Sequence, residues 1–286
     1  MPQHTPPEIF AIVPARGKAD SHALAPQIHA WLHARGYATI DEASIRRGEP
    51  ADALVALGGD GLMMRMAHNH PGMPLLGINF GKVGFLAMTE QLQWPEVLNE
   101  IVNGDFDIQD GPTLDARVGS NDEVVDVGWA INDVVVRSGI QMVDIELYVD
   151  GRYVNTYPGD GMIVASPQGS TAYCMAAGGP ILTAGVSGFA ITPISPHSPI
   201  RSTLVVPEDS RIEMVMSSER EAHLILDGQI TRPLACGELV RVTHSPHRFR
   251  LIMTEQMNFY AAFQSKFNYL IRPGAVPSLG HVRHEE

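Results

Sequence analysis

Apolar and polar residues alternate along the first hundred residues in the pattern of strands that are each followed by a helix. Short apolar runs predict buried strands at Ile9–Val13, Ala53–Leu57 and Pro74–Asn79. Apolar residues at helical spacing predict helices over Ser21–Arg35, Leu62–His70 and Trp94–Asn103. This alternation favours a parallel sheet with helices on its faces, in which ligands bind beyond the carboxyl ends of the strands.

The pattern changes near residue 105. From there to about Met253, short apolar runs are separated by Gly, Pro, Asp and Ser, which predicts strands joined by turns. The predicted strands are Val124–Val127, Ile131–Arg137, Val143–Val149, Met162–Ala165, Leu204–Val206, Ile212–Met216, Ala222–Leu226 and Leu239–Val242. The pair Asp150-Gly151 is typical of a hairpin turn. We expect a mostly antiparallel, sandwich-like β domain.

The last apolar stretch returns to helical spacing over Thr254–Leu270, and we interpret its apolar side as a packing face. These patterns divide the chain into an α/β domain with a parallel sheet at residues 1–108, a β-rich domain at 109–255, a helix at 256–272 and a tail at 273–286. We expect the tail to be mobile.

Composition narrows the function classes. The 286 residues are 44% hydrophobic and 18% charged, which suits a globular protein with a sizeable core. The net charge is -12 and the lysines are Lys18, Lys82 and Lys266, so we expect no nucleic-acid partner. An anionic ligand would have to be held by backbone N–H groups, helix starts, a few arginines and a divalent metal. Neither a leader peptide nor a membrane span is visible, so we expect a soluble, cytoplasmic protein without a membrane partner.

The turn Gly58-Gly59-Asp60-Gly61 follows a predicted strand and opens a predicted helix. Its glycines let phosphates approach the backbone, and the N–H groups at a helix start favour anions. A carboxylate at Asp60 can take a proton from an attacking hydroxyl or help to hold Mg²⁺. It can equally be the N-cap of the helix, and the motif alone leaves these interpretations open.

A second cluster, Gly159–Tyr173, runs from a turn through a short strand into a loop rich in hydroxyl groups. Such hydroxyls can bind a sugar, a phosphate or a base edge, although an ordinary loop with Ser170 as a helix cap has the same pattern. The polar pair Asn132-Asp133 interrupts an apolar run and needs partners, either ribose hydroxyls or the local backbone. Phe85 can stack on a base or belong to the core.

These motifs, in this order, make the chain resemble the NAD kinase family. The resemblance rests on LGGDG at Asp60, NFGKVGFL from Asn79, NDVVV from Asn132, GDGMIVASPQGSTAY from Gly159, PISPHS from Pro193, DGQ from Asp227 and FYAAFQSKFNYL near the C-terminus. GGDG alone is shared with lipid kinases and phosphofructokinases. The long GDG to GSTAY segment after an Asn-acidic pair is far more specific. A P-loop and a complete G-x-G-x-x-G fingerprint are absent from the sequence.

The resemblance implies a kinase that transfers the terminal phosphate of ATP, or of polyphosphate, to the 2′-hydroxyl of the adenosine ribose of NAD, giving NADP. Asp60 would be the base, and Gly58, Gly59 and Gly61 would line the phosphate path. The nucleotide would be bound by Phe85, Asn132, Asp133, Asp160, Ser170, Thr171, Ala172, Tyr173, Ala176 and Gln229. Phosphoryl transfer also calls for a divalent metal, Mg²⁺, with the ATP, and we assign no residue as its ligand.

The resemblance further implies that residues 109–255 bind NAD, that the C-terminal helix packs back on the α/β domain, and that the protein is a homo-oligomer, a dimer or tetramer. Leu62 departs from the family pattern, where a small polar residue is frequent. Two alternatives stay open: a GGDG-type lipid kinase, which needs an apolar acceptor pocket, and a non-catalytic dinucleotide-binding regulator, which would have no use for Asp60.

Overall fold

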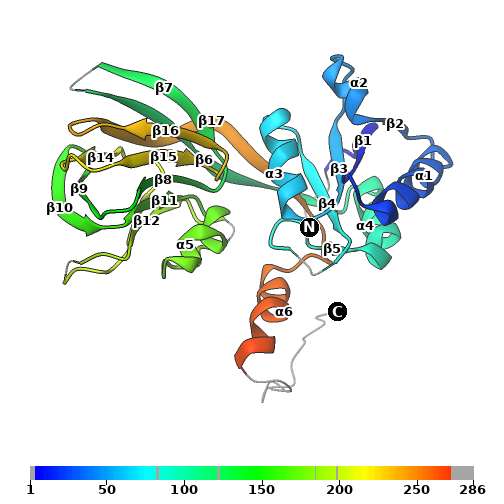
Figure 1. Cartoon of the computed structure of the whole chain (residues 1–286). Helices are drawn as coiled ribbons and strands as arrows, with labels where there is room; N and C mark the ends of the chain where they lie inside the picture. Colours follow the sequence, from blue (N-terminus) through cyan, green and yellow to red (C-terminus); the bar gives the residue numbers. More distant parts are fainter. Residues whose placement is uncertain (1–3, 82–83, 121–122, 184, 198, 272–286) are drawn as a thin grey trace.

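The computed structural model describes residues 4–81, 84–120, 123–183, 185–197 and 199–271, which form two lobes (Figure 1). The predicted tail at 273–286 lies outside the described residues. Within the described residues, no helix is both long enough and apolar enough to cross a membrane.

The first lobe is the predicted α/β domain. Its parallel strands lie in the order β4 (Leu75–Asn79), β3 (Ala53–Leu57), β1 (Ile9–Pro14) and β2 (Ala38–Ile40). The helices between them are α1 (Ala19–His33), α2 (Glu42–Arg46), α3 (Asp60–Asn69) and α4 (Trp94–Val102). All residues of β3 and β4 are buried because helices cover both faces, which explains their unbroken apolar runs. The short strand β5 (Thr89–Glu90) adds to β4.

The second lobe is a sandwich of antiparallel strands, as predicted. One layer contains β6 (Asp107–Ser120), β7 (Glu123–Ala130), β9 (Val143–Val149), β10 (Arg152–Gly159), β14 (Ile212–Met216) and β17 (Leu239–Met253). The other has the order β13 (Leu204–Pro207), β12 (Gly188–Ile194), β11 (Gly161–Ala165), β8 (Asp133–Ser138), β15 (Ala222–Leu226) and β16 (Ile230–Leu234). A core of Val, Leu, Ile and Met from both layers fills the space between them.

The strand β17 joins the two lobes. It pairs antiparallel with β6 and β14 and parallel with β4, where Leu251 lies opposite Leu75, so a single sheet passes through both lobes. The predicted strand ended at Val242, but the observed strand continues to Met253. The polar segment that follows Val242 broke the apolar pattern, and in the structure the register with β6 shifts between His244 and Arg248.

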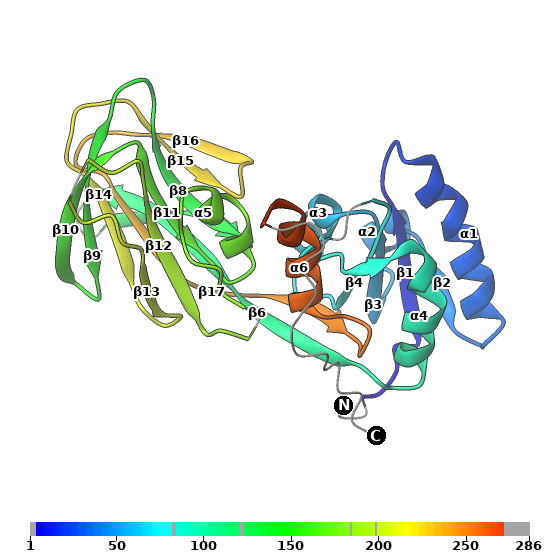
Figure 2. The same ribbon diagram turned by 90° about the horizontal axis from the view of Figure 1, so that it is seen from below.

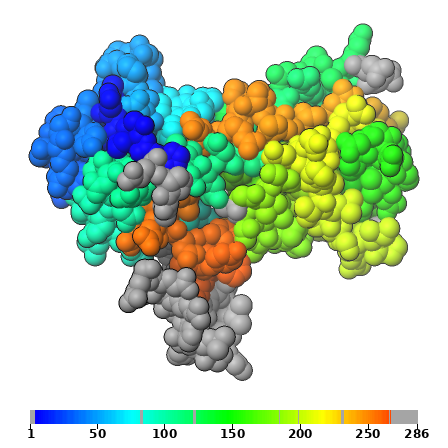
Figure 3. All heavy atoms as spheres, turned by 180° about the vertical axis from the view of Figure 1, so that it is seen from behind, coloured from blue at the N-terminus to red at the C-terminus, as the bar shows by residue number. Residues whose placement is uncertain are grey.

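The C-terminal helix α6 (Phe259–Ile271) packs back on the α/β lobe, as the resemblance implied (Figure 2). Ala262 is buried, and Phe259 and Phe263 pack against the core of that lobe. The space-filling view shows the orange residues of the C-terminal segment between the two lobes (Figure 3). Seen from either side, α3 and α6 lie toward the β-rich lobe, whereas α1 and α4 lie away from it (Figures 1 and 2).

Candidate active site

Asp60 is the first residue of α3, and its carboxylate binds the segment that follows β4. Gly59 is the N-cap of the helix, so the carboxylate does not cap its own helix. Its Oδ2 accepts from the Phe85 amide at 3.0 Å, and its Oδ1 accepts from the amides of Leu86 and Ala87 at 3.1 and 3.0 Å. A carboxylate accepts about four hydrogen bonds, two on each oxygen. Oδ1 is therefore filled, and one acceptor position is left on Oδ2.

The glycines around Asp60 differ in what they do. A Cβ at Gly84 would lie 1.8 Å from Asp60 Oδ1, so only glycine lets the carboxylate reach these amides. The Gly58 N–H is not free for a ligand, since it donates to the carbonyl of Ile78 in β4 at 2.8 Å. Around Gly59 and Gly61, no atom of the described residues lies within 4 Å of an added Cβ. The predicted phosphate path therefore has open space at Gly59 and Gly61 and a structural glycine at Gly58.

Asn132 directly precedes β8, and Asp133 is the first residue of that strand. The Asp227 carboxylate binds the backbone amides of this predicted pair. Asp227 Oδ1 accepts from the amides of Asn132 at 2.7 Å and Asp133 at 3.1 Å, and Oδ2 accepts from the Ile131 amide at 2.8 Å. The fourth partner is His68 Nε2, 2.8 Å from Oδ2. All four acceptor positions of Asp227 are thus occupied, in contrast to Asp60.

The side chains of the pair differ in their surroundings. The Asn132 Oδ1 atom is buried and has no hydrogen-bond partner among the described residues. Asp133 is only 5% exposed. Burial, and then the neighbouring Asp227 carboxylate, raise the pKa of Asp133 to about 7.

The hydroxyl-rich loop packs directly on this pair. The Ser166 hydroxyl donates to the Ile131 carbonyl, and a Cβ at Gly169 would lie 1.9 Å from the Asn132 carbonyl oxygen. Ser170 is fully buried: its hydroxyl donates to the Pro167 carbonyl at 2.6 Å and accepts from the Leu182 amide at 2.9 Å. The Ser170 side chain therefore holds the loop together, and the structure does not place it in either cavity described below.

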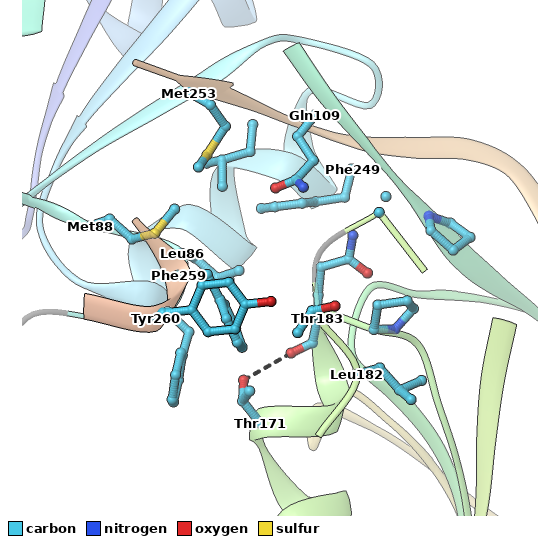
Figure 4. A pocket seen from close by; sticks show the side chains of 17 residues that line it. Leu86, Met88, Gln109, Thr171, Leu182, Thr183, Phe249, Met253, Phe259 and Tyr260 are labelled. Atoms are coloured by element: carbon cyan, nitrogen blue, oxygen red, sulfur yellow. Dashed lines mark hydrogen bonds between the residues drawn. The ribbon is translucent and has the colours of Figure 1, made fainter. Parts of the chain in front are cut away.

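A cavity of about 200 Å³ lies between the lobes and has mostly apolar walls (Figure 4). The α/β lobe supplies Phe85 and Leu86, whose amides bind Asp60, and α6 supplies Phe259 and Tyr260. The hydroxyl-rich loop and the segment after it supply Thr171, Gln168, Leu182 and Thr183, while β6 and β17, which run between the lobes, supply Gln109, Pro112, Phe249 and Met253. The Thr171 hydroxyl donates to the Gln168 carbonyl at 3.1 Å (Figure 4). The cavity therefore adjoins both the Asp60 segment and the hydroxyl-rich loop.

A second cavity, of about 760 Å³, lies within the β-rich lobe. It is lined by Asp160, Tyr173 and Ala176, with the cationic side chains of Arg137 and Arg201. Arg137 lies 5.7 Å from the centroid of the Tyr173 ring. The segment 167–178 borders both cavities. It includes the short turn Gly169–Thr171 and helix α5 (Tyr173–Ala176). Its first half lines the interlobe cavity, and its second half lines the second cavity.

Of the predicted residues, Phe85 and Thr171 line the first cavity, and Asp160, Tyr173 and Ala176 line the second. The linings of these two cavities do not include Asp60, Asn132, Asp133 or Ser170. Ala172 joins the two halves of the shared segment, and its N–H donates to the Gly169 carbonyl at 2.9 Å. Gln229 is exposed in the turn after β15, beside Asp227, and lines neither cavity. Among the described residues, no cluster of three His, Cys, Asp or Glu side chains forms a metal site.

Two family models match most of the chain. The model described as the ATP-NAD kinase N-terminal domain matches residues 10–106, and that of the ATP-NAD kinase C-terminal domain matches residues 131–254. The chain belongs to the NAD kinase family. A Thermomicrobium roseum protein named NAD kinase is 54% identical over 270 residues, covering 94% of this chain and 94% of that protein. One from Methylibium petroleiphilum, with the same name, is 34% identical over 86% of this chain and 83% of that protein.

Solved structures of NAD kinases share the fold. Yeast NADH kinase complexed with NADH matches with a TM-score of 0.82 at 19% identity, over 96% of this chain and 91% of that one. The NAD kinase from Archaeoglobus fulgidus in complex with ATP matches with a TM-score of 0.70 at 24% identity, over 90% and 98%. These matches confirm the predicted fold class.

Two contacts at the site were not predicted. Asp227 entered the sequence analysis only as part of the DGQ motif, and nothing in the sequence indicates that it holds three amides about ninety-five residues away. Lys266 was noted only as one of three lysines in an acidic chain, yet its Nζ lies 3.8 Å from Asp60 Oδ2. The only available signal was its spacing from Phe259 and Phe263 on the packing face of the helix.

Proposed function

We propose that this NAD kinase transfers the terminal phosphate of ATP to the 2′-hydroxyl of the adenosine ribose of NAD, with Asp60 Oδ2 taking the proton of that hydroxyl. The observation that carries this proposal is the single acceptor position left on the Asp60 carboxylate. The three amides fix the carboxylate in place, and the remaining lone pair can meet a hydroxyl. The new bond joins the ribose oxygen to the terminal phosphorus, the bond to the bridging oxygen breaks, and ADP leaves with its electron pair.

Two cavities on either side of one loop suit a ligand with two ends. We propose that the adenosine half of NAD occupies the interlobe cavity near Asp60, with Asn132 and Thr171 as its polar partners and Phe85 as an apolar wall. The other half would occupy the cavity of Asp160, Tyr173 and Ala176. The match to both NAD kinase domain models and the polar, charged lining of the second cavity favour a dinucleotide over a lipid acceptor.

The terminal phosphate of ATP would approach across Gly59 and Gly61, where the start of α3 offers N–H groups and space. Mg²⁺ commonly keeps several waters and is held by substrate phosphates with one or two carboxylates, so a preformed protein cage is not required. Bound with ATP, the metal would neutralise charge on the phosphate oxygens.

The test is NADP formation by the purified protein with NAD, Mg²⁺ and ATP, with polyphosphate and NADH in parallel reactions. In Asp60→Asn, kcat should fall by roughly 10³-fold or more while the Kd for NAD changes little. Asp52→Asn is the matched control, because Asp52 also accepts two backbone amides, those of Glu8 and Ile9, but directly precedes β3, at the opposite end of that strand from Asp60. NAD binding without turnover in the wild-type protein, with any donor, would contradict the proposal and favour a regulator.

We also propose that the protein is a homo-oligomer, as the resemblance implied, and that it is cytoplasmic, as the composition led us to expect. The edge strands β10 and β13 carry exposed apolar side chains, with Tyr153 at 54% and Val205 at 52% exposure. Such side chains on strand edges suit burial against a second copy. Light scattering during size-exclusion chromatography would give the mass directly, and a monomer at micromolar concentration would contradict this assembly.

A further inference from the structure

The C-terminal helix brings a cation to the candidate base. Phe259, Ala262, Phe263 and Lys266 follow one another at i, i+3, i+4 and i+7, so they share a face of α6. The first three pack on the α/β lobe, with Phe259 and Phe85 rings 5.6 Å apart. The same face, one turn further on, therefore delivers Lys266 beside Asp60.

The Lys266 ammonium is held beside Asp60 without forming a hydrogen bond to it. Its Nζ lies 3.8 Å from Asp60 Oδ2 and 4.1 Å from the centroid of the Phe85 ring. Both contacts attract a cation, but 3.8 Å is longer than a hydrogen bond between nitrogen and oxygen. The described residues accept no hydrogen bond from this ammonium, so its three N–H donors can bind a ligand that enters beside Asp60.

Among the described residues, few basic side chains lie near Asp60. The chain has a net charge of -12. Of the nearby basic groups on α3, His68 is bonded to Asp227 and Arg65 lies 3.9 Å from Glu42. Among the described residues, Lys266 is the one basic side chain that forms an ion pair with Asp60. Phosphoryl transfer, however, spreads negative charge over the oxygens of the moving group, and fixed cations stabilise that charge.

We propose that Lys266 is a further catalytic residue, whose ammonium binds the terminal phosphate of ATP and stabilises it during transfer. This rests on the proposed function, because the hydroxyl that meets Asp60 Oδ2 lies next to the phosphorus it attacks. Lys266 keeps its protons throughout and donates hydrogen bonds to the phosphate oxygens. The proton of the hydroxyl goes to Asp60, and the bonds made and broken are those given above.

A purely structural ion pair is the competing explanation. Partly exposed pairs of this kind contribute little to stability. If the ion pair between Lys266 and Asp60 were only structural, its loss would leave kcat almost unchanged, or it would destabilise the packing of α6, which forms part of the wall of the interlobe cavity. Loosening would appear as weaker NAD binding and a lower Tm, because Phe259 and Tyr260 line that cavity.

The experiment compares Lys266→Met, Lys266→Arg and the control Gln264→Met, an exposed position on the same helix. In Lys266→Met we expect kcat to fall roughly 100-fold and the Kd for MgATP to rise roughly tenfold, with the Kd for NAD and the Tm unchanged. Lys266→Arg should recover at least tenfold of the lost kcat, because it restores a cation with donors. Gln264→Met should match the wild type.

Two outcomes would overturn the role of Lys266. One is a kcat and a MgATP affinity in Lys266→Met within about threefold of wild type. The other is a loss of NAD binding and Tm that Lys266→Arg does not repair. The MgATP affinity, measured by calorimetry, does not depend on turnover. A wild-type protein that makes no NADP would therefore contradict the proposed function. The ratio of the MgATP affinities of Lys266→Met and wild type would still show whether Lys266 binds the phosphate of ATP.

Discussion

His68 Nε2 lies 2.8 Å from Asp227 Oδ2 and joins the last turn of α3 to the turn after β15. An ionised carboxylate only accepts, so His68 is the donor and carries its proton on Nε2. The His68 ring also packs on Trp129, with centroids 4.4 Å apart. The helix that presents Asp60 at its first residue is thus fixed, near its last, to the carboxylate that holds the amides of Asn132 and Asp133.

Replacing His68 by Phe should separate the hydrogen bond from the ring packing. His68→Phe keeps an aromatic ring against Trp129 but removes the donor, and it leaves one acceptor position unfilled on Asp227, whose side chain is 2% exposed. We expect the free energy of unfolding to fall by about 1 to 3 kcal/mol, measured by urea denaturation. His223→Phe is the control, since His223 lies 3.9 Å from Glu221 on the exposed side of β15 and should change stability by less than about 0.5 kcal/mol. Equal effects of the two substitutions would show that the bond to Asp227 contributes nothing.

Asp133 should make stability depend on pH. Burial first, and the Asp227 carboxylate second, raise its pKa from 3.8 to about 7. Between these values the folded protein keeps a proton that the unfolded chain has released, so the contribution of this group is fully present below its unfolded pKa and is lost as the pH rises through about 7. Asp133→Asn removes the titrating carboxyl group and with it this loss of stability at higher pH. The free energy of unfolding of the variant, relative to wild type, should therefore rise by up to a few kcal/mol from about pH 5 to about pH 8. A difference that stays constant over this range would refute the assignment.

Gly84 should be needed for the geometry of Asp60. A Cβ would lie 1.8 Å from Asp60 Oδ1, so Gly84→Ala must push the carboxylate away from its amides. A displacement of about 1 Å at a reacting group costs on the order of 10²-fold in rate, and we expect kcat to fall by at least that much. Gly81→Ala is a close control in the same loop, because its Cβ would meet only Asn79 Oδ1, at 3.9 Å. Full activity in Gly84→Ala would mean that the placement of this carboxylate does not limit the reaction.

A substitution at Gly61 tests whether the phosphates of ATP approach the start of α3, and it leaves the fold unchanged. Nothing lies within 4 Å of a Cβ at this position in α3, and alanine is the better helix former by about 1 kcal/mol. Gly61→Ala should therefore melt at the same temperature as wild type or slightly higher. If phosphate groups approach this backbone, KM for ATP should still rise roughly tenfold, the equivalent of about 1.4 kcal/mol. An unchanged KM would move the donor away from the start of α3.

The sequence predicted what local patterns control. The strands Ala53–Leu57, Val143–Val149, Ile212–Met216 and Ala222–Leu226 have the predicted bounds, because each is an apolar or alternating run between turn residues. The strand β12 (Gly188–Ile194) was missed, since Gly and Pro flank and interrupt an apolar run that is buried on both faces.

Contacts between distant segments could not be predicted from local pattern. The motif GGDG indicated that Asp60 matters, but the choice between helix cap and reacting group depends on Phe85, Leu86 and Ala87, which reach it from another loop. In the same way, a hydroxyl in a Ser-rich loop can face inward or outward. The buried orientation of Ser170 is set by Leu182, twelve residues further along the chain.

The path of β17 also governs when this protein can fold during synthesis. The edge of β4 is covered by a strand that ends at Met253, and β6 finds its partner in that same strand. A growing chain that stops after the first lobe has β1 to β5, but the part of the β4 edge around Leu75, which β5 does not cover, lacks its partner, and such an edge can recruit other chains. Completion of the first lobe must wait until nearly the whole chain has left the ribosome. We therefore expect a fragment ending near residue 106 to aggregate rather than to fold as a separate unit.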